Sequence, residues 1–257
     1  MKIIAIIPAR MRSTRFPGKP LAKIHGMEMI GHCYLRTSMC ENLLDTYVAT
    51  CDKEIAEYIE SIGGKTVMTQ KSHQRASDRT AEAMLKIEKA TGVNLDIIVM
   101  VQGDEPMVTP EMITLSLKPF FEDKSVNVVN LMGEIESVEE FDDPNNVKVV
   151  VDKNSDAIYF SREPIPSAKK SETNVSMFKQ ICIIPFKRDY LLKFNSMEET
   201  ELEKFESIDM LRLIENGNKV KMVKSPHPAF SVDTQKDLEN VEYKMRDNLL
   251  MRNYLIS

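Results

Sequence analysis

An apolar run near the amino terminus, followed at once by a cationic loop, constrains the fold more than any other feature. Residues 3–7 are typical of a buried strand. The next segment carries four cations within ten positions, Arg10, Arg12, Arg15 and Lys19. Loops at the carboxyl ends of strands in an open α/β sheet usually bind ligands, and Arg and Lys side chains suit phosphate. The pattern therefore predicts a site for several phosphates, and a solvated basic turn is the alternative.

The remainder of the first half alternates strand-like and helix-like segments. Strands are predicted over residues 46–50, 65–68 and 96–101, and helices over 27–41, 53–62 and 79–91. Gly63 and Gly64 are expected to end the second helix, and Asp78 to cap the third. Such alternation indicates βαβ units and a mostly parallel sheet.

The second half is richer in strand patterns. Strand-like segments cover residues 125–135, 147–151, 157–160, 177–185 and 219–223, with a hairpin expected around 153–155. Residues 167–175 are polar and without periodicity, which predicts a mobile loop. Helices are expected over residues 203–217 and, closing the fold, 233–250. We therefore expect a mixed sheet with a β-rich extension.

The composition narrows the class of protein. The chain has 257 residues, of which 42% are hydrophobic and 28% charged, as in ordinary globular proteins. Its net charge of −5 argues against wholesale binding to nucleic acid or to an anionic membrane. The four cysteines form no C-x-x-C pair, no stretch resembles a cleavable signal, and none is long and apolar enough to cross a bilayer. These features favour reduced thiols and a cytoplasmic location.

A second motif follows the most apolar strand. Residues 101–106 read Val-Gln-Gly-Asp-Glu-Pro, so Asp104 lies at a strand end, and Gly103 allows the backbone close to a ligand. A carboxylate opposite a phosphate loop suits Mg²⁺, which prefers one or two carboxylates with phosphate oxygens and water. The alternative is that Asp104 caps a turn. The chain has no G-x-G-x-x-G, Walker A or G-x-S-x-G motif, which disfavours dinucleotide folds, P-loop kinases and α/β-hydrolases.

Two further polar positions stand out. Asp233 follows a short strand-like segment and is either the N-cap of the closing helix, a second metal ligand, or both. Residues 73–79, His-Gln-Arg-Ala-Ser-Asp-Arg, are dense in donors and acceptors that could bind a base edge or simply form a polar surface.

Taken in order, these motifs resemble a known family. The segments concerned are residues 7–20, 48–50, 73–79, 101–106, 147–150, 159–166 and 232–238. Together they resemble the 3-deoxy-manno-octulosonate cytidylyltransferases, also called CMP-Kdo synthetases, over nearly the whole chain. The resemblance implies a Rossmann-like α/β fold of the nucleotide-diphospho-sugar transferase type. It also implies a Mg²⁺-dependent reaction of CTP with an eight-carbon 2-keto sugar acid, giving CMP-sugar and pyrophosphate, as in lipopolysaccharide biosynthesis.

The resemblance also implies roles for residues of a single domain spanning 1–257. Its parts would be a nucleotide-binding half over 1–124, a sugar-binding and dimerisation half over 125–230, and a closing helix over 231–257. Nucleotide-binding residues would be Pro8, Ala9, Arg10, Ser13, Arg15, Lys19, Gln74, Ser77 and Arg79; catalytic residues Arg10, Arg15, Lys19 and Asp104; metal ligands Asp104 and Asp233; and sugar-binding residues Gln102, Arg162, Gln180, Glu206 and Asp209. The family is typically a homodimer.

The chain departs from the family pattern mainly at the sugar side. Where the family shows H-x-G-x-Y, residues 180–184 read Gln-Ile-Cys-Ile-Ile, and the L-E-x-L-R segment has Asp209 in place of Glu. Cys51 precedes Asp52 where Asp-Asp is usual, and Arg75 and Ala76 replace small residues. A modified or amino-substituted octulosonate, or a nonulosonate, is therefore an alternative substrate. A non-catalytic nucleotide-binding protein and a uridylyl- or guanylyltransferase are the rival functions.

Overall fold

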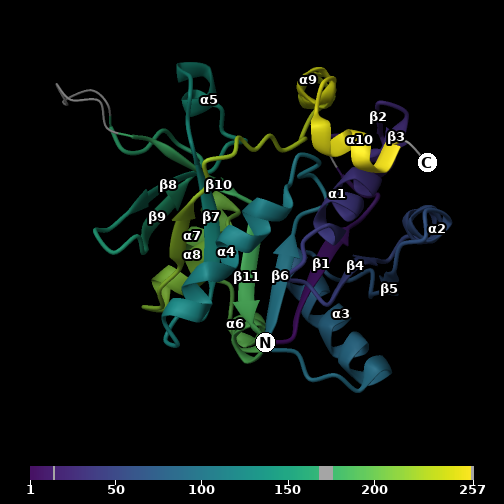
Figure 1. The fold of residues 1–257 in the computed structure, drawn as a ribbon. Helices are drawn as coiled ribbons and strands as arrows, with labels where there is room; N and C mark the ends of the chain where they lie inside the picture. Colours follow the sequence, from purple (N-terminus) through teal and green to yellow (C-terminus); the bar gives the residue numbers. More distant parts are fainter. Residues whose placement is uncertain (14, 168–175, 256–257) are drawn as a thin grey trace. The chain divides into compact units, whose positions relative to one another are not determined.

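The protein is described here from a computed structural model, which defines residues 1–13, 15–167 and 176–255 (Figure 1). Thr14 and all but the first residue of the loop predicted over 167–175 lie outside the described residues. The chain forms two compact units. Unit 1 comprises Met1–Thr114 and Ala229–Ser257, and unit 2 comprises Leu115–Pro228. The structure thus divides the chain at residues 114 and 228, where the sequence predicts divisions at 124 and 230.

Unit 1 contains a parallel sheet. The strands run in the order β6-β1-β4-β5, and every pairing among them is parallel. The strands of unit 1 are β1 (Ile3–Ala9), β2 (Lys23–Ile24), β3 (Met27–Glu28), β4 (Asp45–Thr50), β5 (Thr66–Met68) and β6 (Ile97–Val101). Every residue of β1 and β6 is buried, as expected for strands covered on both faces. Because the strands are parallel, their carboxyl ends meet at one edge of this sheet.

Unit 1 also contains helices, of which the last two follow all the strands of the chain. They are η1 (Lys19–Leu21, a 3-10 turn), α1 (Met29–Ser38), α2 (Lys53–Ser61), α3 (Ala76–Thr91), α9 (Gln235–Met245) and α10 (Leu249–Leu255), and the division between the units falls within α4 (Pro110–Glu122). Among the described residues, no helix combines the length and apolarity that a bilayer span requires.

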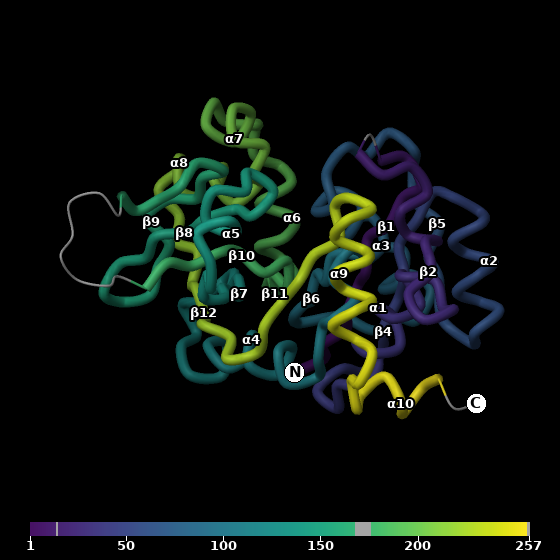
Figure 2. Tube along the Cα trace, turned by 90° about the horizontal axis from the view of Figure 1, so that it is seen from above, coloured from purple at the N-terminus to yellow at the C-terminus, as the bar shows by residue number. Residues whose placement is uncertain are grey.

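The last segment of the chain packs back into unit 1 (Figure 2). Val232, Val241 and Met245 are fully buried in one cluster with Ile24 and Met29. Polar contacts reinforce this packing: the Tyr254 hydroxyl lies 2.7 Å from Nδ1 of the buried His32 and accepts a hydrogen bond from Arg36 Nε at 3.0 Å. The residues from 229 onward are therefore part of the core of unit 1.

Unit 2 contains a mixed, mainly antiparallel sheet in the order β12-β7-β10-β8-β9. Only the β12–β7 pairing is parallel. The elements of unit 2 after α4 are β7 (Val129–Glu134), α5 (Val138–Asp142), β8 (Lys148–Val151), β9 (Ala157–Ser161), β10 (Phe178–Ile181), β11 (Ile183–Lys187), α6 (Arg188–Ser196), α7 (Glu201–Glu206), α8 (Met210–Glu215) and β12 (Lys221–Lys224). The β8–β9 pair is antiparallel, which confirms the hairpin predicted around residues 153–155. The fold is an α/β fold with a β-rich extension, as the sequence predicted.

Several local predictions were wrong. The helix expected over 203–217 is two helices, α7 and α8, because Ser207 adopts a left-handed conformation with φ of 54° that ends α7. The strand expected over 177–185 is interrupted at Cys182, which separates β10 from β11. The helix α4 was not predicted at all. Asp78 does not cap α3: that helix begins at Ala76, so Asp78 lies in its first turn.

Candidate active site

A cavity of about 670 Å³ lies in unit 1 and is lined by residues from both of its chain segments. Its wall contains almost every nucleotide and metal residue expected from the sequence: Pro8, Ala9, Arg10, Ser13, Arg15, Lys19, Gln74, Arg79, Asp104 and Asp233. Cations outnumber acids there, because Arg12, Lys71 and Arg75 join the wall and only Asp52 adds a carboxylate. Such a surface attracts a polyanion.

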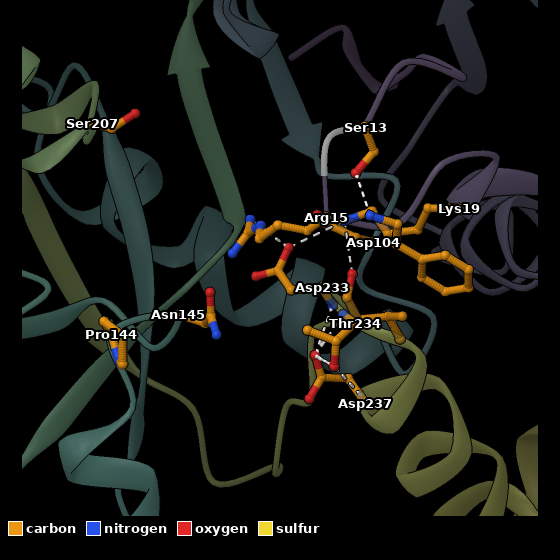
Figure 3. Close-up of polar contacts among 12 residues, drawn as sticks. Ser13, Arg15, Lys19, Asp104, Pro144, Asn145, Ser207, Asp233, Thr234 and Asp237 are labelled. Atoms are coloured by element: carbon orange, nitrogen blue, oxygen red, sulfur yellow. Dashed lines mark hydrogen bonds and ion pairs between the residues drawn. The ribbon is translucent and has the colours of Figure 1, made fainter.

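Lys19 lies at the centre of the polar contacts in this cavity (Figure 3). Its Nζ donates to Asp104 Oδ2 at 2.8 Å, to the Val232 carbonyl at 2.7 Å and to Asp233 Oδ1 at 3.3 Å. Arg15 Nη2 also donates to Asp233 Oδ1, at 2.8 Å. Burial opposes ionisation of Lys19, but the two carboxylates outweigh it, so the pKa of Lys19 is raised. Two acids more than a hundred residues apart therefore meet on one ammonium group.

Close packing of strand ends brings Asp104 to this position. Gly103 follows the end of β6, and a Cβ there would lie 3.1 Å from the Pro8 carbonyl oxygen and 3.0 Å from Ile30 Cδ1. Any other residue would push the Pro8 carbonyl and the Ile30 side chain away by a few tenths of an ångström. The Val232 N–H donates to the Asp104 carbonyl at 2.9 Å, which ties the returning chain to the end of β6.

Asp233 does not cap the closing helix, contrary to one reading of the sequence. Thr234 is the N-cap of α9, and its hydroxyl oxygen accepts a hydrogen bond from the Asp237 N–H at 3.2 Å. In return, Asp237 Oδ2 accepts from the Thr234 N–H at 2.8 Å and from the Asp233 N–H at 3.1 Å. This reciprocal capping box leaves the Asp233 carboxylate available to Arg15 and Lys19.

Main-chain bonds fold the basic loop back on itself. The Gly18 N–H donates to the Met11 carbonyl at 3.2 Å, and Gly18 has a φ of 74° that favours glycine. The Met11 N–H donates to Asp52 Oδ2 at 2.7 Å. Sequence reasoning gave Asp52 no role, although it follows the end of β4 by two residues, much as Asp104 follows the end of β6 by three. That shared position was the signal that could have identified it.

In the segment over residues 73–79, some side chains line the cavity and others are buried in the core. Gln74 is exposed in the cavity wall, whereas Ser77 is fully buried and does not line it. Arg79 is almost fully buried, and its guanidinium donates to the Thr69 hydroxyl. His73 Nε2 lies 2.5 Å from Glu82 Oε2, an oxygen that also accepts from the Gln70 N–H. Although burial opposes ionisation, these donors and Lys86 lower the pKa of Glu82 to about 2.

The residues predicted to bind the sugar are distributed over both units. Gln102 lies in the cavity wall of unit 1. In unit 2, the Glu206 carboxylate accepts hydrogen bonds from the Ser161 hydroxyl at 2.7 Å, the Arg162 N–H at 2.8 Å and the Tyr159 hydroxyl at 3.2 Å. Burial of this carboxylate is outweighed by these donors, and the pKa of Glu206 is lowered.

The other residues of unit 2 that were predicted to bind the sugar are Arg162, Gln180 and Asp209, and each makes contacts of its own. The Arg162 side chain donates to the main-chain carbonyls of Glu206 at 2.6 Å, Pro144 at 2.9 Å and Ser207 at 3.5 Å. Gln180, on β10, donates instead to Asn130 on β7 at 2.5 Å. Asp209 is the N-cap residue of α8. Within the described part of the chain, no hydrogen bond links the Gln180 side chain to the group around Glu206.

The donor set suits one hard divalent ion. No group of three or more His, Cys, Asp or Glu side chains able to hold a metal occurs in the described parts of the chain. Asp104 and Asp233 nevertheless converge on the same cation, Lys19. Two carboxylates beside a polyanion site match the preference of Mg²⁺, which takes its remaining ligands from phosphate and water.

Comparisons with known proteins agree with this geometry. Residues 4–222 match the family model described as "Cytidylyltransferase". The chain is 40% identical over 255 residues to a 3-deoxy-manno-octulosonate cytidylyltransferase of Geobacter metallireducens, covering 95% of this chain and 98% of the relative. It is 42% identical over 248 residues to the enzyme of that name from Fusobacterium nucleatum, covering 96% and 98%.

A comparison with solved structures also finds a similar synthetase. The structure of CMP:2-keto-3-deoxy-manno-octonic acid synthetase complexed with CTP superposes with a TM-score of 0.86 at 35% identity, covering 95% of this chain and 98% of that one. A cytidylyltransferase from Leptospira borgpetersenii, at 17% identity and a TM-score of 0.61, shares the fold. On sequence and structure alike, this chain belongs to the cytidylyltransferase family.

Proposed function

We propose that the protein transfers a cytidylyl group from CTP to the anomeric 2-hydroxyl of 3-deoxy-manno-octulosonate, releasing pyrophosphate. The observation that carries the proposal is the convergence of Asp104 and Asp233 on Lys19 in a cavity rich in cations. The names of the relatives at about 40% identity and the CTP complex of the structural neighbour support the choice of nucleotide and sugar.

The basic loop would bind the triphosphate. Arg10, Ser13, Arg15 and Lys19 all line the cavity, as do Pro8 and Ala9. Forked guanidinium donors and an ammonium would neutralise the leaving pyrophosphate, so catalysis would depend mainly on positioning and charge.

The segment after β5 would bind the nucleoside. Gln74 and Arg79 line the cavity and would contact cytosine and ribose. Ser77 is buried in α3 and would act by holding that segment in place.

Asp104 and Asp233 would hold Mg²⁺. Bound there, the ion would reduce the charge on the α-phosphate and lower the pKa of the attacking hydroxyl. Lys19 now neutralises both carboxylates. The phosphates of an incoming nucleotide would compete for its ammonium group and so release the two acids as ligands.

Unit 2 and Gln102 would supply the sugar site. Arg162, Gln180 and Asp209 would contact the sugar acid, whereas the three internal hydrogen bonds of Glu206 favour a supporting role for that carboxylate. Because Gln180 and Ile184 replace the histidine and tyrosine usual in the family, an amino-substituted octulosonate or a nonulosonate is the alternative substrate.

Two further properties follow from family membership. We infer a homodimer formed through the β-rich unit, which sedimentation analysis would test. We also infer a cytoplasmic location, with which the free thiols of all four cysteines agree.

The decisive experiment measures pyrophosphate release. The protein would be incubated with Mg²⁺ and CTP, UTP or GTP, each with 3-deoxy-manno-octulosonate, its amino-substituted form or a nonulosonate. The proposal expects release with CTP and an octulosonate, and much slower release with the other nucleotides. Nucleotide binding without turnover of any acid would support the non-catalytic rival, and a preference for UTP or GTP would overturn the assignment to CTP.

A further inference from the structure

A buried amide pair in unit 2 has a fixed hydrogen-bond direction. Asn130 lies on β7 and its side chain is fully buried. Its Nδ2 donates to the main-chain carbonyl of Ile181 at 2.7 Å and to that of Leu131 at 2.9 Å. Carbonyl oxygens only accept hydrogen bonds, so the amide of Asn130 cannot be turned round without losing both bonds.

This fixes the orientation of Gln180. The Asn130 Oδ1 can only accept, and it lies 2.5 Å from the side-chain nitrogen of Gln180. If the Gln180 amide were reversed, two oxygen atoms would face each other at hydrogen-bond distance. The main chain of Gln180 is held as well, since its N–H donates to the Val147 carbonyl at 2.7 Å. The Gln180 Oε1 therefore points away from Asn130.

That oxygen can accept a hydrogen bond from a ligand. Gln180 is only half-buried, and within residues 1–13, 15–167 and 176–255 no group donates to its Oε1. An acceptor held in one orientation binds a ligand donor well, because its side chain need not be reordered on binding. It also discriminates strongly against a ligand that lacks the donor, since the oxygen is then left without its partner.

We propose that Gln180 is a specificity-determining residue that accepts a hydrogen bond from one hydroxyl or amino group of the acceptor sugar, and that Asn130 is the positioning residue that orients it. The proposal rests on the function proposed above and adds a residue, Asn130, and a direction of hydrogen bonding to it. Because the amide cannot reverse, this contact rejects a substrate that presents only an acceptor at that position.

The test pairs a protein variant with substrate analogues. Gln180→Met keeps the size of the side chain and removes the acceptor. It is compared with the wild type on the parent sugar acid and on a series that lacks, or carries as a methyl ether, one hydroxyl at a time. We expect the variant to lower kcat/KM for the parent sugar about tenfold, the loss of roughly one neutral hydrogen bond, while KM for CTP changes less than twofold. Asn154→Ala, an exposed amide in the hairpin turn of the same unit, is the control and should change neither value.

One analogue should identify the contact. The wild type should discriminate against it about tenfold, whereas Gln180→Met should treat it like the parent sugar. Asn130→Ala frees the amide to reverse, and we expect it to increase use of the methyl ether at that position relative to the parent. If Gln180→Met keeps wild-type discrimination at every position, the inference is overturned although the proposed function stands. If the wild type turns over no sugar acid with CTP, the proposed function fails and the inference fails with it.

Discussion

Replacing Lys19 by methionine tests the arrangement at the centre of the site. The substitution keeps the alkyl chain and removes the ammonium that contacts Asp104 at 2.8 Å and Asp233 at 3.3 Å. Removing one partner of a fully buried ion pair costs about 3–5 kcal/mol. Here the side chains keep 13–22% of their exposure, and the remaining acids are partly hydrated. We therefore expect a loss of about 2–3 kcal/mol in the free energy of unfolding, measured by urea titration with a chelator present.

The same substitution should strengthen binding of a free divalent ion. In the wild type, an ion that takes both carboxylates must first break their contacts with Lys19. Without that competitor, the affinity for the ion should rise by a similar free energy, about 30- to 150-fold. Titration with Mn²⁺ in the absence of nucleotide measures this directly, and the ion should also restore the lost stability.

Lys23→Met is the matched control, because it removes the same charge from a side chain that is 65% exposed and 3.9 Å from Glu28. It should change stability and Mn²⁺ affinity little. If Lys19→Met were as stable as the wild type, or bound Mn²⁺ no better, the view that Lys19 and the metal compete for the same two acids would be refuted.

Three other outcomes are expected. Asp104→Asn should reduce turnover by at least about 100-fold with an unchanged circular dichroism spectrum, since a ligand charge is lost; full activity would contradict its role in metal binding. Burial lowers the pKa of His32 to about 4, so between pH 6.5 and 4 the unfolded state binds the proton first and stability should fall by roughly 3 kcal/mol as the pH drops; His32→Gln, followed by urea titration at each pH, should lack this slope. Arg212→Met should lower the free energy of unfolding, measured by chemical denaturation, by about 3–5 kcal/mol, because it leaves the buried Glu203 carboxylate without its cation. Adding Glu203→Leu should recover most of this loss. If the losses of the two substitutions were additive, the two residues would not form a stabilising pair.

The general position of the site followed from the sequence. Apolar runs that end at Ile7 and Val101 predict parallel strands, and parallel strands bring their carboxyl ends to one edge of the sheet. This is why the basic loop and Asp104 could be expected to lie close together. That Asp233 joins them could only be a hypothesis, because nothing in the local pattern specifies how a distant segment returns to the sheet.

Capping and helix breaks were harder to predict. Asp233 and Thr234 are both good N-cap residues, and the choice depends on Asp237, whose position three residues after Thr234 signals a capping box. Asp78 favours a helix start, yet α3 begins two residues earlier, and an acid in the first turn is equally favourable to the helix dipole. The break at Ser207 depends on a backbone conformation that the apolar pattern over residues 203–217 does not reveal.

Because unit 1 is built from two separate stretches of chain, protein synthesis produces its four parallel strands long before it completes the active site. Every strand of β6-β1-β4-β5 has been translated by residue 101, but Asp233, the capping box and Tyr254 leave the ribosome more than a hundred residues later. A nascent chain at that stage carries the cationic loop with only one of its two acids. Premature termination before residue 233 would therefore leave a protein with these four strands but with Lys19 and Arg15 deprived of the carboxylate that they share.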